Sequence, residues 1–258
     1  MASSVDPEQL TTKVQQMYQR VAQQPHGTYH FQLGRPLAVR LGYSERVLDR
    51  IPPGAVESFA GVGHFFDLAA LGPSETVVDL GSGAGMDAFY AATLVGPSGR
   101  VIGIDFTPAQ VEKARRLAAD GGFGHVEFRG ERIENPSVDD ASADCIISNG
   151  VINLAADKQA VFDAAARMLR PGGRMAIADI VTERQLSDAI VGNAELWASC
   201  IGGAAQEDAY QEAIEAAGLF IAQIRRNRYE FLSAQAGSAT RRYGVKSISV
   251  LAEKRGSS

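Results

Sequence analysis

The stretch VVDLGSGAGMD, from Val77 to Asp87, constrains the fold of this 258-residue chain more than any other. A β-branched, apolar run that leads into several glycines is typical of a buried strand followed by a tight turn. The next residues, Met86 to Val95, are mostly alanine and apolar residues, which predicts a helix directly after the turn. Glycines let the turn adopt positive φ and let a ligand approach the backbone, and the helix N-terminus offers unpaired N–H groups. The stretch therefore predicts a nucleotide site at the carboxyl end of a strand in an open α/β sheet.

Strand and helix patterns alternate after this turn, which indicates a parallel sheet with right-handed crossovers. We expect strands near residues 76–80, 100–105, 125–129, 143–148 and 174–181, and helices near 85–95, 108–119 and 157–169. A helix over Glu207–Ala217 is then followed by two long alternating segments, Phe220–Phe231 and Val245–Leu251, which predict an antiparallel edge of the sheet.

The residues before the first strand lack strand alternation and predict a helical cap. Pro7 suits the first position of a helix, which ends near Pro25. Aromatic and histidine side chains gather in this segment at Tyr29, His30, Phe31, His64, Phe65 and Phe66. Two interpretations remain open: the rings pack the cap onto the core, or some of them form the roof of a substrate pocket.

The chain divides, on this pattern, into a cap or substrate lid at 1–72 and a core at 73–258, with a lid-like insertion at about 184–206. An apolar content of 45% and a charged content of 21% are ordinary for a globular protein. The 25 basic and 30 acidic residues give a net charge of −5 without a basic block, which argues against a nucleic-acid partner.

No segment indicates a membrane or a secretory route. No apolar run approaches the roughly 18 residues of a membrane span, and the first residues, MASSVDPEQL, lack the apolar core of a signal peptide. Two cysteines, Cys145 and Cys200, do not make a disulfide framework. We expect a cytoplasmic protein without a membrane partner, and the composition leaves the oligomeric state open.

The spacing of the glycines distinguishes between classes of nucleotide. The dinucleotide fingerprint is GxGxxG/A with an acid about 20 residues later. Gly81 and Gly83 fit it, but Met86 holds the third position, which disfavours an NAD-dependent oxidoreductase. The third glycine, Gly85, comes one place early, and Asp79 precedes the turn. This D-x-G-x-G-x-G arrangement resembles motif I of the class I S-adenosylmethionine-dependent methyltransferases.

Three further segments follow in the order of that superfamily. VIGIDF contains Asp105 at the end of the second strand, CIISN ends at Asn149, and LRPGGRMAIADI contains an Arg-Pro-Gly-Gly turn before a strand. The resemblance implies an α/β fold: a Rossmann-like doubly wound sheet of seven strands, the last of them antiparallel. It also implies S-adenosylmethionine as the cofactor and S-adenosylhomocysteine as the product.

The resemblance places the cofactor at the switch point of the sheet. Asp105 would hold both ribose hydroxyls, the glycine turn would lie against the methionine part, and Asp79 would orient the turn or meet the ammonium group through a water. The residues expected to bind the cofactor are Asp79, Gly81, Ser82, Gly83, Gly85, Asp105, Phe106, Arg132, Ile133, Glu134 and Asn149.

Methyl transfer from an activated cofactor needs positioning and a dry site, and a base only where the acceptor carries a proton at the reacting atom. Tyr29, His30 and His64 are the candidates for such a base, and Trp197 and Cys200 are the candidates for substrate contact. No metal is expected, and the partner is a small-molecule methyl acceptor.

The segments SNGVINLAADKQAVFDAAARMLRPGGRMAIADI, ESFAGVG and WASCIGGA resemble the arsenite methyltransferase family over about residues 28–218. Members of that family bind trivalent arsenic through cysteine thiolates. Cys200 matches one of those cysteines, Gly150 stands where another lies, and the N-terminal pair has no counterpart before Tyr29. Cys145 lies five residues before the expected position, where strand alternation predicts that it packs in the core.

The thiolate set is thus incomplete, while the scaffold and the cofactor site resemble the family. We favour methyl transfer from S-adenosylmethionine to a small organic acceptor, of the kind found in specialised metabolism. One alternative is arsenite methylation by Cys200 together with external thiols such as glutathione. Another is a protein that binds S-adenosylmethionine without transferring its methyl group.

Overall fold

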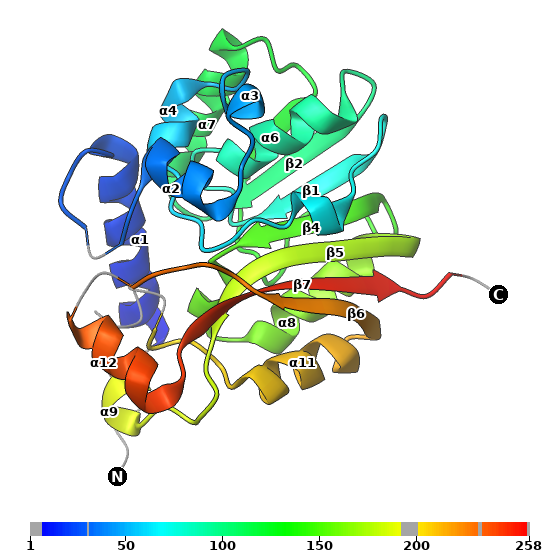
Figure 1. Ribbon diagram of the computed structural model, residues 1–258. Helices are drawn as coiled ribbons and strands as arrows, with labels where there is room; N and C mark the ends of the chain where they lie inside the picture. The colour runs from blue at the N-terminus through cyan, green and yellow to red at the C-terminus, as the bar shows by residue number, and fades with distance from the viewer. Residues whose placement is uncertain (1–6, 30, 192–200, 232–233, 257–258) are drawn as a thin grey trace.

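A seven-stranded sheet with helices on both faces forms the centre of the protein in the computed structural model, which describes residues 7–29, 31–191, 201–231 and 234–256 (Figure 1). The strand order is β3-β2-β1-β4-β5-β7-β6. The strands are β1 (Thr76–Leu80), β2 (Arg100–Asp105), β3 (Val126–Gly130), β4 (Ala143–Asn149), β5 (Leu169–Val181), β6 (Leu219–Arg226) and β7 (Lys246–Lys254). The first five pair in parallel, and β7 is antiparallel to both β5 and β6. The expected class I sheet with an antiparallel last strand is confirmed.

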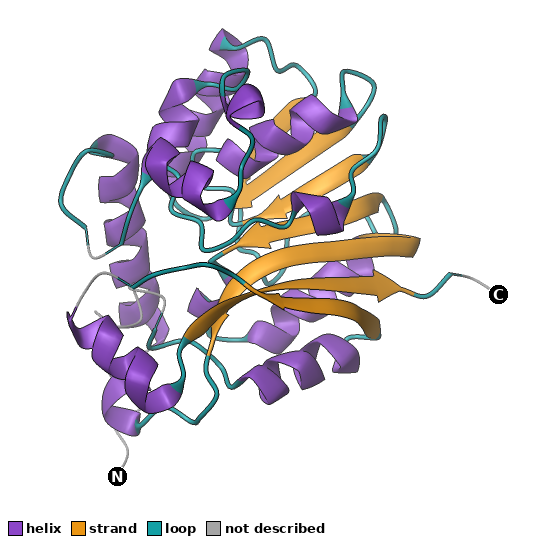
Figure 2. Cartoon of the chain, viewed as in Figure 1, coloured by secondary structure: helices purple, strands orange, loops and turns teal. Residues whose placement is uncertain are grey.

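The helices form layers on the two faces of this sheet (Figure 2). Consecutive side chains of a strand point to opposite faces of the sheet, so they pack against different helix layers. Val77 belongs to one buried apolar cluster and Val78 to the other. One layer contains α6 (Met86–Val95) and α7 (Pro108–Asp120), and the other contains α8 (Lys158–Met168) and α11 (Glu207–Ala216). The remaining helices are α1 (Pro7–Gln23), α2 (Gly34–Leu41), α3 (Glu45–Leu48), α4 (Pro53–Glu57), α5 (Phe66–Ala69), the 3-10 turn η1 (Ile152–Leu154), α9 (Asp188–Val191) and α12 (Ala234–Tyr243).

Strand β5 begins five residues earlier than expected, at Leu169. Ala143 pairs with Leu169, and Cys145 pairs with Arg174, so the Arg-Pro-Gly-Gly segment bulges out of the pairing with β4. Gly172 in this bulge has a φ of +78°. The expected turn therefore exists as an irregularity inside the strand.

The prediction that a strand continues to Phe231 is wrong, because β6 ends at Arg226. Asn227 still donates its N–H to the Ser247 carbonyl at 2.9 Å. Beyond it, the alternating aromatic residues Tyr229 and Phe231 pack edge-on against each other, with ring centroids 5.1 Å apart. Helix α12, which the sequence did not reveal, precedes β7.

Helix α1 lies over the carboxyl edge of the sheet. Its Val14 packs near Phe106, which follows β2, and near Leu154, which follows β4. Gln110 on α7 donates to the Tyr18 carbonyl at 2.9 Å. These contacts place the cap next to the expected cofactor site, although the division into a lid at 1–72 and a core stays a prediction.

The insertion near 184–206 begins and ends at the carboxyl end of β5. Thr182 donates its N–H to the Ala205 carbonyl, and Glu207 donates to the Thr182 carbonyl, each at 2.9 Å. Trp197 and Cys200 lie outside the described residues. Among the helices that the structure does describe, none is long and apolar enough to cross a membrane.

Candidate functional site

The turn between β1 and α6 is folded back against β2. The N–H groups of Gly81 and Ser82 both donate to the Ile104 carbonyl, at 2.7 and 2.9 Å, and Gly85 donates to the Ser82 carbonyl at 2.8 Å. The glycines at 81, 83 and 85 have φ angles of +78°, +53° and +92°. Since only glycine adopts this region without strain, the spacing seen in the sequence is required by the backbone.

The three glycines differ in what surrounds them. A Cβ on Gly81 would overlap the Val151 side chain, and a Cβ on Gly85 would lie 2.5 Å from a phenyl ring. A Cβ on Gly83 would meet only the Gln110 side-chain oxygen, at 3.9 Å. Gly83 therefore keeps open a space in front of the turn.

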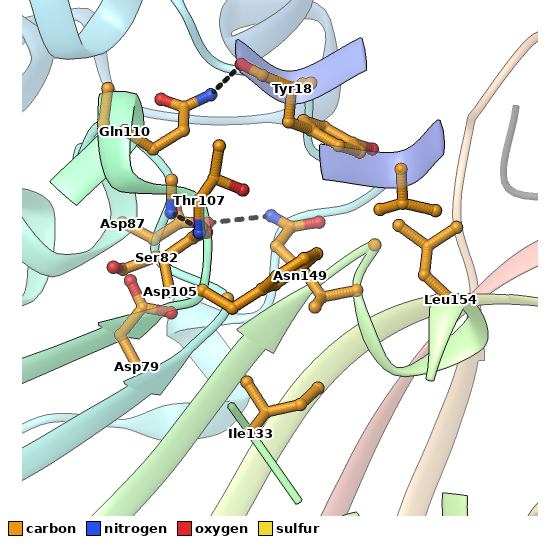
Figure 3. A pocket seen from close by; sticks show the side chains of 18 of the residues that line it. Tyr18, Asp79, Ser82, Asp87, Asp105, Thr107, Gln110, Ile133, Asn149 and Leu154 are labelled. Atoms are coloured by element: carbon orange, nitrogen blue, oxygen red, sulfur yellow. Dashed lines mark hydrogen bonds between the residues drawn. The ribbon is translucent and has the colours of Figure 1, made fainter. Parts of the chain in front are cut away.

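That space is part of a cavity of about 1100 Å³, partly open to solvent, at the carboxyl ends of β1, β2 and β4 (Figure 3). The expected cofactor residues that line it are Asp79, Gly81, Ser82, Gly83, Asp105, Phe106, Arg132, Ile133, Glu134 and Asn149. Gly85 is buried behind the turn and does not line it. Ten of the eleven residues predicted to bind the cofactor thus line one cavity, together with polar residues that were not predicted, such as Asp87 and Gln110.

Asp105 connects the glycine turn to the end of β2. One carboxylate oxygen accepts the Thr107 N–H at 2.8 Å, and the other accepts the Gly83 N–H at 2.9 Å. Burial raises the pKa of Asp105, and these two backbone donors oppose the rise. Each carboxylate oxygen has a second lone pair, so the group can still accept a hydrogen bond from each of two ligand hydroxyls.

Three buried polar atoms on residues that line the cavity have no hydrogen-bond partner within the described part of the chain. They are Asp79 Oδ2, Ser82 Oγ and Gln110 Oε1. A buried polar atom without a partner costs about 1–3 kcal/mol. Their position around one cavity, together with the open space at Gly83, fits a polar ligand with its own hydrogen-bond donors.

Four carboxyl groups line the cavity: Glu134, which pairs with Arg132, and the group formed by Asp79, Asp105 and Asp87, which makes the cavity acidic. Burial and the two neighbouring carboxyls raise the pKa of Asp79 well above its usual range. Burial also raises the pKa of Asp87 to about 6, against the hydrogen bonds that Tyr43 and Asn149 donate at 2.6 and 3.0 Å. The cavity therefore favours a ligand that carries positive charge.

Asn149 joins the cap to this acidic group. Its side-chain oxygen accepts the N–H groups of Val62 and Gly63, at 2.8 and 3.3 Å. Its side-chain nitrogen donates to Asp87 and to the Tyr43 hydroxyl oxygen, each at 3.0 Å. Asn149 thus lines the cavity, as expected, and also holds the loop that precedes α5.

Two of the three candidate bases, Tyr29 and His64, lie in the described part of the chain, and neither lines the cavity. Tyr29 donates its hydroxyl to the Gln24 carbonyl at 2.8 Å. His64 Nδ1 lies 3.4 Å from Asp67, and its ring packs edge-on against Tyr43. Burial lowers the pKa of His64. His30 lies outside the described residues, so the roles of all three stay predictions.

The cap contributes other side chains to the cavity than those the sequence suggested. Thr11, Val14 and Tyr18 of α1 line it, together with Phe59–Gly61. In Figure 3, Tyr18 projects from α1 toward the side that Leu154 forms. The helix itself was predicted from the sequence, but the surface that it covers was not.

Comparison with known proteins identifies the family. Residues 71–218 match the family model described as a methyltransferase domain. The chain belongs to this methyltransferase family. An arsenite methyltransferase from Halobacterium salinarum is 42% identical over 185 residues, which are 72% of this chain and 47% of that protein. Nocamycin O-methyltransferase from Saccharothrix syringae is 33% identical over 138 residues, 53% of this chain and 49% of that protein.

A solved structure supports the same assignment. CrArsM, an arsenic (III) S-adenosylmethionine methyltransferase from Chlamydomonas reinhardtii, superposes with a TM-score of 0.63 at 26% identity, covering 87% of this chain and 74% of that one. The expected membership of the S-adenosylmethionine-dependent methyltransferase family is confirmed. This methyltransferase chain spans about half the length, or less, of the curated relatives that it matches first.

The affinity of this methyltransferase for S-adenosylmethionine is expected to fall as the pH drops below about 6. Asp87, whose pKa burial raises to about 6, becomes protonated there, and the cavity loses negative charge. A cationic ligand stabilises the ionised carboxyls, so affinity should rise with pH through this range. Calorimetric Kd values between about pH 5 and pH 7 check this, because the ligand's amino group stays charged there.

S-adenosylhomocysteine, which lacks the sulfonium charge, is the control ligand for this titration. Its affinity should change less over the same pH range. Equal pH dependence for the two ligands, or none for either, would contradict an electrostatic role of the buried carboxyls.

Proposed function

We propose that this chain transfers the methyl group of S-adenosylmethionine to a small organic acceptor. The observation that carries the proposal is the position of Gly150, which stands where the arsenite methyltransferase family has a cysteine. Gly150 lines the cavity with a φ of +70°, and a Cβ there would lie 3.1 Å from a Val62 methyl group. A cysteine at this position would be strained and crowded, so the backbone itself opposes a thiolate.

The rest of the cavity supports an organic acceptor. Apolar side chains from the cap and from the loop after β4 line it, among them Val14, Phe59 and Leu154. Cys145 is fully buried in the sheet, as predicted, and burial raises the pKa of its thiol to about 12. Among the described residues, no cysteine lines the cavity. Apolar walls suit a carbon skeleton better than a small inorganic acceptor such as arsenite.

The residues present fit the cofactor. When bound, S-adenosylmethionine supplies a methyl group that is already activated on a sulfonium. Asp105 would accept the ribose hydroxyls, and the acidic group around Asp79 and Asp87 would stabilise the positive charge. Helix α1 would exclude water from the reacting groups. The chain would thus position the cofactor and the acceptor in a site without water. This role requires no described side chain as a base.

Arsenite methylation is the second candidate, and the 42% identity to the Halobacterium salinarum enzyme favours it. It would depend on Cys200 and on external thiols such as glutathione. The third candidate is a protein that binds S-adenosylmethionine without transferring its methyl group. Such a protein would form no S-adenosylhomocysteine. Formation of S-adenosylhomocysteine separates the two enzymes from a binding protein.

Labelled S-adenosylmethionine tests the two acceptors together. The purified chain is incubated with arsenite and glutathione, and separately with a pooled small-molecule extract, and the products are separated by mass. We expect label in an organic molecule, no methylated arsenic, and unchanged activity in Cys200→Ser.

Cys145→Ala is the matched control, because it removes the other thiol from a site away from the cavity. Methylated arsenic that disappears in Cys200→Ser but not in Cys145→Ala would replace the proposal by arsenite methylation.

A further inference from the structure

A second hollow, which we call the basic groove, lies at the same edge of the sheet as the cofactor cavity. It encloses about 1430 Å³, part of it open solvent. The side chains that matter here are Arg40, Arg226, Arg228, Tyr229, Phe231 and Arg241. They come from the end of α2, the end of β6 and the segment after it, and α12. The start of antiparallel β7 pairs with the end of β5, so β7 begins at the carboxyl edge of the sheet, next to α12 (Figure 1).

The four arginines of the basic groove are exposed, and within the described residues none has a carboxylate at ion-pair distance. Nearby cations behave differently. Arg225 forms a two-pronged ion pair with Asp67, and Lys246 lies 3.1 Å from Glu183 and 2.7 Å from Glu207. Arg225 and Lys246, the second of which also lines the groove, are thus neutralised, whereas the four arginines of the groove are not.

Few acidic side chains offset this charge. Glu230 is the acidic residue that lines the basic groove, and an adjoining hollow adds Arg184 and Arg242 beside Glu183. The whole chain carries a net charge of −5, so the acidic excess lies elsewhere. Several guanidinium groups around one hollow repel one another, and an anion bound among them would remove that repulsion.

The chemistry of the groove indicates the class of ligand. Guanidinium groups bind carboxylates and phosphates through paired hydrogen bonds, and they also stack on rings. Tyr229 and Phe231 form an edge-on pair with an interplanar angle of 85° on the same segment as two of the arginines. We propose that the basic groove binds a small organic anion, with a carboxylate or phosphate ester held by the arginines and a ring held by the aromatic pair.

The basic groove is a site separate from the cofactor cavity, since the two share no lining residue. The loop around Val62 lies between them: Ser247 of the groove donates its hydroxyl to the Val62 carbonyl at 2.7 Å, and Val62 donates its N–H to Asn149 of the cavity. Binding of a ligand to the basic groove can therefore be measured separately from cofactor binding and methyl transfer.

Binding of 1-naphthyl phosphate to the full chain tests the proposal, with 1-naphthol and inorganic phosphate as partial ligands. We expect saturable binding of one equivalent of 1-naphthyl phosphate, weakened by salt, and much weaker binding of either partial ligand. The double variant Arg226→Ala/Arg241→Ala should lower the affinity about 10- to 100-fold, as expected for the loss of charged hydrogen bonds. Its affinity for S-adenosylmethionine should not change.

Arg46→Ala/Arg116→Ala is the charge-matched control, because both side chains are exposed and lie away from the groove. It should bind 1-naphthyl phosphate as the unchanged chain does. No saturable binding, or an equal loss in the control, would overturn the proposal. Tighter, groove-dependent binding of RNA than of 1-naphthyl phosphate would also overturn it, in favour of a macromolecular partner.

Discussion

Replacing Gly83 by valine is expected to abolish binding of S-adenosylmethionine in a chain that still folds. The new side chain would project into the cavity, where the nearest atom is the Gln110 oxygen, 3.9 Å from the Cβ. The positive φ of +53° adds a strain of about 1–2 kcal/mol, which a domain of this size can tolerate. We expect at least a roughly 100-fold loss of affinity by calorimetry, with a native circular-dichroism spectrum.

Gly122→Val is the control for Gly83→Val, because it introduces the strain of a positive φ without filling the cavity. Gly122 has a φ of +71°, is exposed, and has no atom within 4 Å of a built Cβ. It should lose similar stability and keep its affinity. Gly81→Val should instead unfold the turn, because its Cβ overlaps Val151. Normal affinity in folded Gly83→Val would move the cofactor to another place.

The strands on the cofactor side of the sheet could be predicted from the sequence to within about one residue. Most are short apolar runs that end at or next to a glycine, an acid or an amide, and these signals are local. The expected strands near 76–80, 100–105, 125–129 and 143–148 correspond to β1, β2, β3 and β4. Asp105 and the glycines lie at the ends of those strands, so the part of the cavity that they form could be predicted from the sequence.

The side of the cavity that α1 covers is formed by contacts between segments far apart in the sequence. A local sequence pattern does not predict such contacts. Gln110 bonds to Tyr18 across 92 residues of sequence, and this bond helps fix α1 over the cavity. Tyr29 and His64 were predicted as candidate bases because aromatic and histidine residues are dense in the segment before the first strand. In the structure His64 instead packs against Tyr43 inside the cap, away from the cavity.

Asp87 was missed for a similar reason. An acidic residue in the first turn of a helix is common, since it complements the helix dipole. Its burial beside Tyr43 and Asn149 became visible only when segments 44 and 62 residues away were brought together. The alternation of the aromatic residues around 229–231 imitates a strand, so the predicted strand was too long; helix α12 lies beyond it, in a segment for which no element was predicted.

Asp105→Ala is expected to weaken S-adenosylmethionine binding by about 2–3 kcal/mol, a loss of roughly 30- to 150-fold. The carboxylate accepts N–H bonds from Gly83 and Thr107, so its loss affects both the ribose contact and the glycine turn. Asp120→Ala, at the exposed end of α7, is the control and should bind normally.

A pair of ligands separates the two effects of Asp105→Ala. Adenosine carries both ribose hydroxyls, and 2′,3′-dideoxyadenosine lacks them. If Asp105 holds the ribose, the variant should lose affinity for adenosine and lose much less for the dideoxy ligand, because the coupling energy resides in the missing hydrogen bonds. Equal losses for both ligands would mean that Asp105 acts through the Gly83 turn alone. Calorimetric titration of the four combinations gives the coupling energy directly.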